Sequence, residues 1–318
     1  MTPQVFDKRL RTLLPAEQIQ TNAPLAPLTT FRVGGPADWL VEVRTVAQVT
    51  DVVRAARAAR VPVTVLGGGS NVVVSDEGVR GVVMRIHLTG ISQPATDRAR
   101  AEAGVTINGL VRWTISHGLA ALEAWAGTPG TVGGAIFGNA HFGGRNIGDL
   151  IATVMVVTPV GEPIVVPAGE MEFAYDTSRL KRTGETLVWA EFGVMPGDPE
   201  RLRRRARESL AYRKGTQPLA MPSAGCVFQN PDPSLDRLPA GVPWSAGALV
   251  DRAGLKGHSI GGARISSDHA NFIVNDGHAT AREIRALIER ARAAVRDRFG
   301  VELRDEVVFL GKHEGHEA

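Results

Sequence analysis

Residues 127–140 read Gly-Thr-Pro-Gly-Thr-Val-Gly-Gly-Ala-Ile-Phe-Gly-Asn-Ala, with five glycines in the first twelve positions. A single turn needs fewer glycines, and loops of this density usually lie where the backbone approaches a flat or phosphorylated ligand. A mobile surface loop is the alternative, but Val132, Ile136 and Phe137 are too apolar for that interpretation. The stretch therefore favours a ligand-binding loop.

A second glycine loop lies earlier in the chain. Val63–Leu66 predicts a short strand, and Gly67-Gly-Gly-Ser-Asn71 follows it directly. Glycines let backbone N–H groups approach an anion closely, and the serine and asparagine add side-chain donors. The spacing matches neither a Rossmann turn nor a Walker loop. A phosphate-binding loop and a plain tight turn therefore both remain open.

Length and composition indicate an ordinary globular protein. The chain has 318 residues, of which 43% are apolar and 22% charged. At about 150 residues per domain, this length allows two or three domains. No stretch approaches the roughly 18 consecutive apolar residues of a membrane helix, and no apolar signal region is visible at the N-terminus. The single cysteine, Cys226, cannot form an internal disulfide, which favours a reducing compartment.

The charge balance narrows the choice of ligand. The net charge is +3 and the pI about 9.3, with 36 Lys and Arg residues of which five are Lys. Arginine binds phosphate and carboxylate in a bidentate manner, so an anionic small molecule or a nucleic acid would suit. Only 5% of residues are aromatic, and no basic stripe carries interleaved aromatics. Single-stranded nucleic acid is therefore disfavoured.

The hydrophobic pattern predicts a mixed α and β chain with a boundary near residue 196, at Pro196-Gly-Asp-Pro199. The most strongly patterned helix covers 280–298, with Thr280 as its cap. Other helices are expected in 1–20, 46–60, 105–125 and 201–214. Strands are expected at 41–43, 63–66, 72–74, 79–86, 151–158, 163–167, 187–195, 226–229, 270–274 and 301–310.

Three single residues could carry chemistry. Cys226 is more often a small buried hydrophobe, yet a neutral thiol with a pKa of about 8.5 is a usable proton donor. Glu306 lies in the last expected strand, where an acidic side chain is usually exposed to solvent. His269 is more often a structural histidine than a catalytic base. The histidines show no zinc-ligand spacing, so no metal site is expected.

Taken together, the motifs resemble those of the UDP-N-acetylenolpyruvoylglucosamine reductase family, in order from about Asn22 to Gly311. Each motif is weak alone, and their joint order makes the match specific. They are Thr29-Thr-Phe-Arg-Val-Gly-Gly35, Leu66-Gly-Gly-Gly-Ser-Asn71, Gly127–Ala135 with Asn139-Ala140, Gln217-Pro218, Ser223-Ala-Gly-Cys-Val-Phe-Gln-Asn-Pro231 and His269-Ala-Asn-Phe-Ile-Val-Asn275.

The resemblance implies an α+β fold. It consists of a bipartite FAD-binding domain of the vanillyl-alcohol-oxidase type and an α+β substrate-binding domain. In this chain the first would cover 1–196, with two subdomains split near residue 80, and the second 197–318. The C-terminal strand 301–311 would return toward the active site. The length and the short stretch between Tyr212 and Ser223 are similar to the shorter type of the family.

The resemblance also implies a reaction. NADPH reduces non-covalently bound FAD, and UDP-N-acetylglucosamine enolpyruvate is then reduced to UDP-N-acetylmuramate, a peptidoglycan precursor. Hydride goes to the vinyl C3, so the enzyme must stabilise charge at the adjacent carboxylate and deliver a proton to C2. A cytoplasmic enzyme is implied, with a UDP-sugar as partner and without nucleic acid, membrane or obligate protein partner.

Two alternatives remain open. One is another FAD-linked oxidoreductase of the same fold, acting on an alcohol or hydroxy acid, and the other is a non-catalytic nucleotide-binding module. The oligomeric state and the preference for NADPH over NADH are not fixed by the sequence.

The family motifs assign roles residue by residue. The family's proton-donating Ser corresponds to Cys226, and its carboxylic partner to Glu306. The Arg of the family's Tyr-Arg-x-Ser motif corresponds to Asp176, which leaves Arg179 as the stand-in cation, although strand alternation would turn it to the other face. Expected cofactor-binding residues are Arg32, Gly67, Gly68, Gly69, Ser70, Asn71, Gly127, Thr128, Pro129, Gly133, Gly134, Ala135 and Asn139. Expected substrate-binding residues are Tyr175, Arg213, Gln217, Asn230 and His269.

Overall fold

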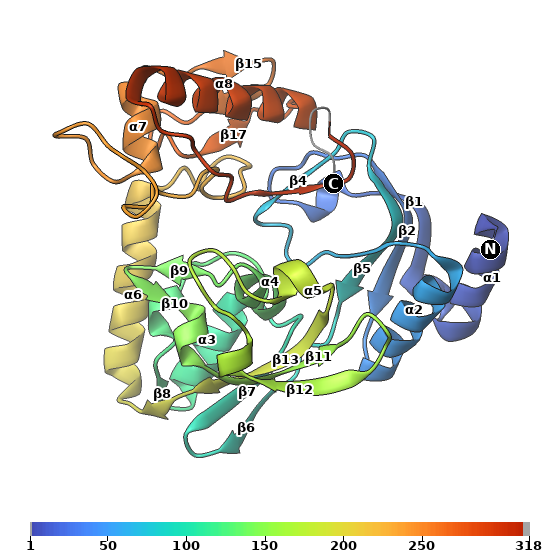
Figure 1. Ribbon diagram of the computed structural model, residues 1–318. Helices are drawn as coiled ribbons and strands as arrows, with labels where there is room; N and C mark the ends of the chain where they lie inside the picture. Colours follow the sequence, from blue (N-terminus) through green and yellow to red (C-terminus); the bar gives the residue numbers. More distant parts are fainter. Residues whose placement is uncertain (1, 314–318) are drawn as a thin grey trace. The chain divides into compact units, whose positions relative to one another are not determined.

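The computed structural model describes residues 2–313, which form two compact units (Figure 1). Unit 1 comprises the chain up to Ala23, Asp38–Gly68 and Arg80–Arg213. Unit 2 comprises Pro24–Ala37, Gly69–Val79 and the chain from Lys214. Two short segments of the N-terminal half, Pro24–Ala37 and Gly69–Val79, thus belong to unit 2, and the boundary near residue 196 stays a prediction.

The first layer of unit 1 is a four-stranded sheet in the order β1-β2-β5-β3, associated with helices α1 and α2 (Figure 1). Phe6 and Leu10 of α1 pack with Trp39 and the apolar face of α2 in one core cluster. The hydroxyl of Thr45 caps α2 by accepting from the Gln48 amide. The bounds are α1 (Pro3–Leu13), β1 (Ile19–Pro24), β2 (Pro36–Val43), α2 (Val46–Ala59), β3 (Val63–Val65) and β5 (Val79–Ile86).

The second layer of unit 1 is an antiparallel sheet in the order β12-β11-β13-β7-β6. Its core packs around Trp125, Leu110 and Ile136, which are fully buried. The bounds are β6 (Ile91–Ala95), β7 (Arg98–Glu102), α3 (Ile107–Ser116), α4 (Val132–Phe137), β11 (Ile151–Val157), β12 (Pro163–Pro167), α5 (Leu180–Thr183), β13 (Thr186–Gly193) and α6 (Pro199–Thr216). Short pairs are β8 (Leu119–Ala120) with β14 (Met195–Pro196), and β9 (His141–Phe142) with β10 (Arg145–Asn146).

Unit 2 combines two small sheets with two helices. A three-stranded sheet runs β15-β16-β17, and β18 pairs in parallel with β4. Helix α8 begins at the expected cap, Thr280, which forms a capping box with Glu283, and the predicted apolar stripe of the helix is buried. The bounds are β4 (Val72–Val74), α7 (Ala246–Arg252), β15 (Ser259–Ile260), β16 (Ala263–Ile265), β17 (Ile273–Asn275), α8 (Ala281–Phe299) and β18 (Val308–Leu310).

Three strand predictions in unit 2 were wrong in extent, and one of them is 270–274, where the strand covers only Ile273–Asn275. The segment 226–229 forms no strand, only a single bridge between Phe228 and Asp305, and the strand expected at 301–310 is confined to β18. The backbone at 227 turns from one partner to another, because the Val227 amide donates to Asn271 while its carbonyl accepts from Glu306. In a regular antiparallel strand the amide and carbonyl of one residue bond to the same neighbouring strand, so this arrangement at Val227 interrupts the ladder.

Candidate functional site

The two glycine loops of the sequence meet in unit 1. A Cβ atom on Gly67 would lie 2.8 Å from the Thr131 hydroxyl, and one on Gly68 would lie 2.7 Å from the Gly130 Cα. These separations are too short for any side chain, so both positions require glycine. The glycines expected to approach a ligand are therefore also needed for the approach of one loop to the other.

The backbone amides of the first loop are open. Within residues 2–313, none of the five amides of Gly67–Asn71 donates a hydrogen bond. Gly69 has φ +62°, the left-handed conformation that glycine adopts without strain, and within unit 2 its carbonyl accepts from the Thr30 amide at 2.9 Å. Consecutive unpaired amides in a glycine turn are what a phosphate group needs. The loop therefore fits the pyrophosphate of a dinucleotide cofactor.

The second loop contains a helix that the sequence analysis missed, α4. Its first amides are used within unit 1: Val132 donates to Val105, Gly133 donates to Ala103, and the Gly134 amide donates to the Thr131 hydroxyl. The end of this helix is thus already capped. Any ligand contact by Gly133, Gly134 or Ala135 must come from the face of the loop rather than from the helix end.

Arg213 of α6 adds a cation to this loop. Its side chain is buried, Nη2 donates to the Thr128 hydroxyl at 2.8 Å, and the guanidinium lies 3.7 Å from the centre of the Phe142 ring. The Ser209 hydroxyl of α6 donates to the carbonyl of Ala124, three residues before this loop, at 2.6 Å. The helix predicted as basic therefore contributes one inward-facing arginine.

Asn139 lies inside unit 1. It is 1% exposed, its Nδ2 donates to the Ala174 carbonyl at 2.8 Å, and its Oδ1 accepts from the Gly148 amide at 2.9 Å. With both ends of the amide used, the side chain joins the glycine loop to its neighbours. The cofactor-binding role expected of Asn139 stays a prediction.

The segment in place of the family's Tyr-Arg-x-Ser motif carries a buried carboxylate. Asp176 has φ +53°, which aspartate tolerates better than most residues, and the Lys181 ammonium lies 3.4 Å from its Oδ2. Tyr175 is 43% exposed, with its ring 4.8 Å from that of His141. Burial lowers the pKa of His141, and the charge of Arg213 acts in the same direction against that of Asp176. The charged form of His141 is therefore disfavoured at this position.

Arg179 has a partner of its own. Nε and Nη2 donate to the two carboxylate oxygens of Glu185 at 2.9 and 2.7 Å, and the Glu185 side chain is only 5% exposed. This bidentate pair holds Arg179 at the start of α5. Nε and Nη2 of Arg179 are therefore used in a structural ion pair with Glu185.

In unit 2 the structure brings Cys226, Glu306 and Asn71 into one backbone network. The Glu306 amide donates to the Val227 carbonyl at 2.8 Å, one residue beyond the half-buried Cys226. The Asn71 side chain donates to the Glu306 carbonyl at 3.0 Å, and the Val308 amide donates to the Asn71 carbonyl. Three motifs separated by up to 235 residues along the chain therefore meet at the predicted proton donor.

Asn271 is a residue that the sequence analysis missed. It is buried, its Oδ1 accepts from the Phe228 amide at 2.9 Å, and its Nδ2 donates to the Phe228 carbonyl at 2.8 Å. Nearby, Nδ1 of His269 accepts from the Asn271 amide, and burial lowers the pKa of His269. The available signal was the motif 269–275, an Asn next to buried apolar residues, but nothing in it distinguished Asn271 from His269.

The other predicted residues of unit 2 are more open. Arg32 is exposed at a left-handed backbone position, with φ +58°. Asn230 is exposed, and its Oδ1 accepts from the Ala246 amide at the start of α7. Gln217 is half-buried just after α6. The described residues contain no cluster of His, Cys, Asp and Glu that could hold a metal ion.

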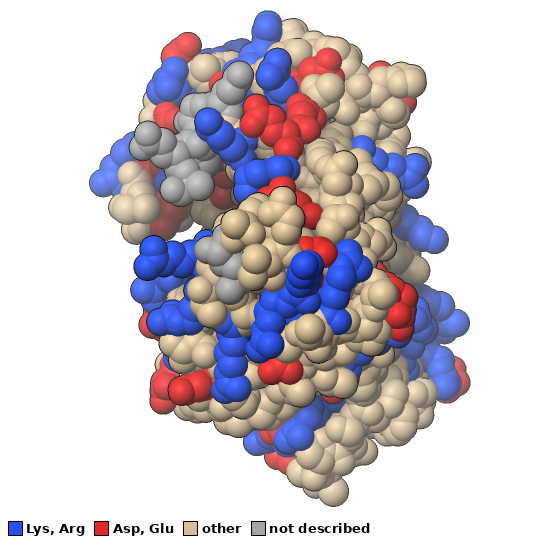
Figure 2. Space-filling model, turned by 90° about the vertical axis from the view of Figure 1, so that its right-hand side faces the viewer, with Lys and Arg blue, Asp and Glu red and all other residues tan. Residues whose placement is uncertain are grey.

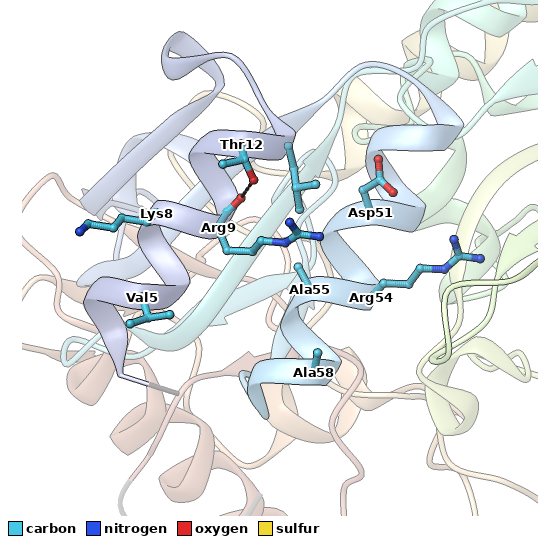
Figure 3. A pocket seen from close by; sticks show the side chains of 9 residues that line it. Val5, Lys8, Arg9, Thr12, Asp51, Arg54, Ala55 and Ala58 are labelled. Atoms are coloured by element: carbon cyan, nitrogen blue, oxygen red, sulfur yellow. Dashed lines mark hydrogen bonds between the residues drawn. The ribbon is translucent and has the colours of Figure 1, made fainter.

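A groove between α1 and α2 shares no residue with the predicted site. Figure 3 shows its walls, which enclose about 680 Å³ and include Val5, Lys8, Arg9 and Arg54. On the face drawn in Figure 2, groups of Lys and Arg are interrupted by neutral and acidic residues, so that face carries no continuous basic stripe. Among residues 2–313, no helix has both the length and the apolar character needed to cross a bilayer.

Both parts of the sequence match known protein families. Residues 217–310 match the family model described as UDP-N-acetylenolpyruvoylglucosamine reductase, C-terminal domain, and residues 37–166 match an FAD binding domain. A UDP-N-acetylenolpyruvoylglucosamine reductase of Synechococcus sp. (strain JA-3-3Ab) is 39% identical over 296 residues, 92% of each chain. A UDP-N-acetylenolpyruvoylglucosamine reductase 2 of Symbiobacterium thermophilum is 39% identical over 308 residues, 96% of each chain.

A solved structure agrees with these relatives. The crystal structure of the reductase from Thermus caldophilus covers 92% of this chain and 98% of its own, at 33% identity and a TM-score of 0.75. The predicted α+β class, with an FAD-binding domain and a second domain, is thereby confirmed.

Proposed function

Because the chain belongs to the UDP-N-acetylenolpyruvoylglucosamine reductase family, we propose that the two residue groups described above serve cofactor binding and substrate reduction. The protein is an FAD-dependent oxidoreductase that uses NADPH to reduce UDP-N-acetylglucosamine enolpyruvate to UDP-N-acetylmuramate. The relatives at 39% identity support this function over the alternative, another FAD-linked oxidoreductase of the same fold acting on an alcohol or hydroxy acid.

Gly67, Gly68, Gly69, Ser70 and Asn71 would hold the FAD pyrophosphate through their open amides. When bound, FAD would supply the hydride-transfer chemistry between NADPH and the enolpyruvyl double bond. Non-covalent binding is part of the proposal. The other cofactor residues would be Arg32, Gly127, Thr128, Pro129, Gly133, Gly134 and Ala135, while Asn139 would shape the loop.

Cys226 would donate its thiol proton to C2 of the substrate, and Glu306 would hold or replenish that proton. The single observation that carries this assignment is the hydrogen bond from the Glu306 amide to the Val227 carbonyl, at 2.8 Å. It fixes the two backbone segments next to each other. A thiol is a stronger acid than a serine hydroxyl, so a cysteine here keeps a neutral donor and makes it more acidic.

We assign the charge that meets the anionic substrate to Arg213. Its guanidinium is buried in the glycine loop beside Thr128, whereas the donors of Arg179 are bound by Glu185 and Asp176 is paired with Lys181. The role predicted for Arg179 thus passes to Arg213 in this proposal. Tyr175, Gln217, Asn230 and His269 remain the proposed substrate contacts.

Residues 1–196 would form the cofactor part and 197–318 the substrate part, in line with the two family models. The enzyme would act in the cytoplasm, without nucleic acid, membrane or obligate protein partner. The deciding experiment measures NADPH oxidation by the FAD-loaded protein with and without the enolpyruvyl UDP-sugar, with product identified by mass. Equal oxidation in both cases and no UDP-N-acetylmuramate would refute the proposed function.

A further inference from the structure

Arg292, in the middle of α8, has no role in the site as described so far. Its guanidinium makes three contacts at once: Nε donates to the Leu303 carbonyl at 3.0 Å, Nη2 to Asp305 Oδ1 at 2.5 Å, and Nη1 to Glu289 Oε2 at 2.5 Å. The side chain is only 16% exposed. The planar guanidinium donates in several fixed directions, which a lysine at this position could not do.

Two of these contacts fall on the segment directly before Glu306. Arg292 holds the backbone at Leu303 and the side chain of Asp305, so it binds the segment on both sides of residue 304. The opposite edge of the segment is held by the Gln229 amide, which donates to the Arg304 carbonyl at 2.9 Å. The segment is therefore fixed between α8 and the chain that carries Cys226.

The ion pair has an electrostatic cost that calls for an explanation. Burial raises the pKa of Asp305, and the charge of Arg292 opposes that rise. Burying a charged pair often contributes no more stability than apolar residues of the same size would. Such a pair is better explained by the geometry it imposes, and here that geometry belongs to the residue before Glu306.

We propose that Arg292 is a positioning residue for proton delivery, because it fixes Leu303–Asp305 and thereby sets the direction of the Glu306 side chain. The inference depends on the role proposed for Glu306. Arg292 touches neither substrate nor cofactor in this account. It acts through the backbone of its neighbours, and small displacements of such a group from its productive geometry cost about 10- to 100-fold in rate.

A purely structural role makes a different prediction. If Arg292 only supported the fold, its loss would weaken unit 2 as a whole, and flavin reduction by NADPH would fall together with substrate reduction. A positioning role affects only the step that needs the proton. The two half-reactions, measured separately by stopped-flow absorbance, therefore distinguish the two roles.

The test compares Arg292→Met with Arg296→Met in the FAD-loaded protein. Arg296 lies one turn along α8 and is 56% exposed, so its variant receives the same substitution without contacts to 303–305. We expect Arg292→Met to slow substrate reduction at least about tenfold, to leave flavin reduction within about twofold, and to enlarge the solvent deuterium isotope effect on substrate reduction. Arg296→Met should match the wild type in all three measurements.

Two further measurements keep the proposal testable if Arg292→Met folds poorly. The double variant Arg292→Met/Asp305→Asn removes both charges and leaves no buried unpaired carboxylate, and it should show the same selective loss. Hydrogen exchange of the cofactor-free chain should show faster exchange in a peptide spanning 303–308 for the Arg292 variants alone.

Three outcomes would overturn the positioning role: proportionate loss in both half-reactions, unchanged exchange at 303–308, or full retention of substrate reduction. If the wild type itself fails to reduce the enolpyruvyl substrate, the proposed function fails instead. In that case the hydrogen-exchange experiment still tests whether Arg292 holds the segment 303–305.

Discussion

The side-chain amide of Asn71 donates a hydrogen bond to the main-chain carbonyl of Glu306 at 3.0 Å. This contact ties the end of the first glycine loop to the segment that carries the proposed proton network. We expect Asn71→Ala to cost about 1 kcal/mol in the free energy of unfolding, the usual value of one such bond. Urea titration measures this cost. The variant should also slow substrate reduction more than flavin reduction. If each half-reaction runs at the same rate in the variant as in the wild type, this link between the loop and the proton network is contradicted.

Cys226→Ala removes the proposed proton donor without removing the flavin site. Flavin reduction by NADPH should stay within about twofold, while substrate reduction falls by about 100-fold or more, the usual contribution of general acid catalysis. Cys226→Ser restores a neutral donor and should recover much of the rate. Stopped-flow absorbance of each half-reaction is the measurement, and a parallel loss in both would exclude the donor role.

Gly68→Ala tests the contact between the two glycine loops. The new methyl group would lie 2.7 Å from the Gly130 Cα, so one loop must move. We expect the purified protein to lose most of its bound flavin, scored as the absorbance ratio at 450 and 280 nm. Gly169→Ala is the matched control, since nothing lies within 4 Å of its added methyl group. Full flavin retention by Gly68→Ala would argue against this loop as the pyrophosphate site.

Arg213→Met and Arg179→Met separate two roles for arginine. Loss of Arg213 should raise the KM for the enolpyruvyl substrate about tenfold, because one charged hydrogen-bond donor disappears. Loss of Arg179 should leave KM unchanged and cost about 2 kcal/mol in the free energy of unfolding, because the nearly buried Glu185 carboxylate loses its cation. Steady-state kinetics and urea unfolding of both variants give the answer. The reverse pattern would restore Arg179 as the substrate cation.

The stability of unit 1 should depend on pH through His141. Burial lowers the pKa of His141 in the folded protein, so the unfolded chain binds a proton more readily. Stability is therefore greatest above the unfolded pKa of about 6.5 and declines as the pH falls below it. His141→Gln should flatten the decline in Tm between pH 7.5 and 5.5, whereas the exposed His278→Gln should not. Identical slopes for wild type and His141→Gln would contradict the assignment.

The sequence predicted those elements whose signals are local. Helix α8 has a capping box and a single apolar stripe, and β4, β5 and β12 are runs rich in β-branched residues, so their bounds agreed closely with the prediction. The hairpin β6–β7 was missed because its exposed strand carries Ser, Gln and Pro. Helix α4 was missed because glycine disfavours helices, and here tertiary contacts of Val132 and Ile136 override that preference.

The site could be predicted only as a set of motifs. Family order placed Cys226, Glu306 and the glycine loops, but no spacing in the sequence connects Asn71 to a residue 235 positions away. Likewise, the pairing of Arg179 with Glu185 and that of Arg292 with Asp305 arise from the way helices and loops pack. Charge complementarity at this level depends on three-dimensional neighbours, and a single chain read along its length does not reveal them.

Cys226 allows site-specific labelling of the chain without any substitution. It is the one thiol among 318 residues, and it is half-buried. A small thiol-selective reagent or a fluorinated tag would therefore attach at a single place, next to the proposed proton network. The rate of attachment, followed with and without the UDP-sugar, would report on occupancy of the site in the unmodified natural chain.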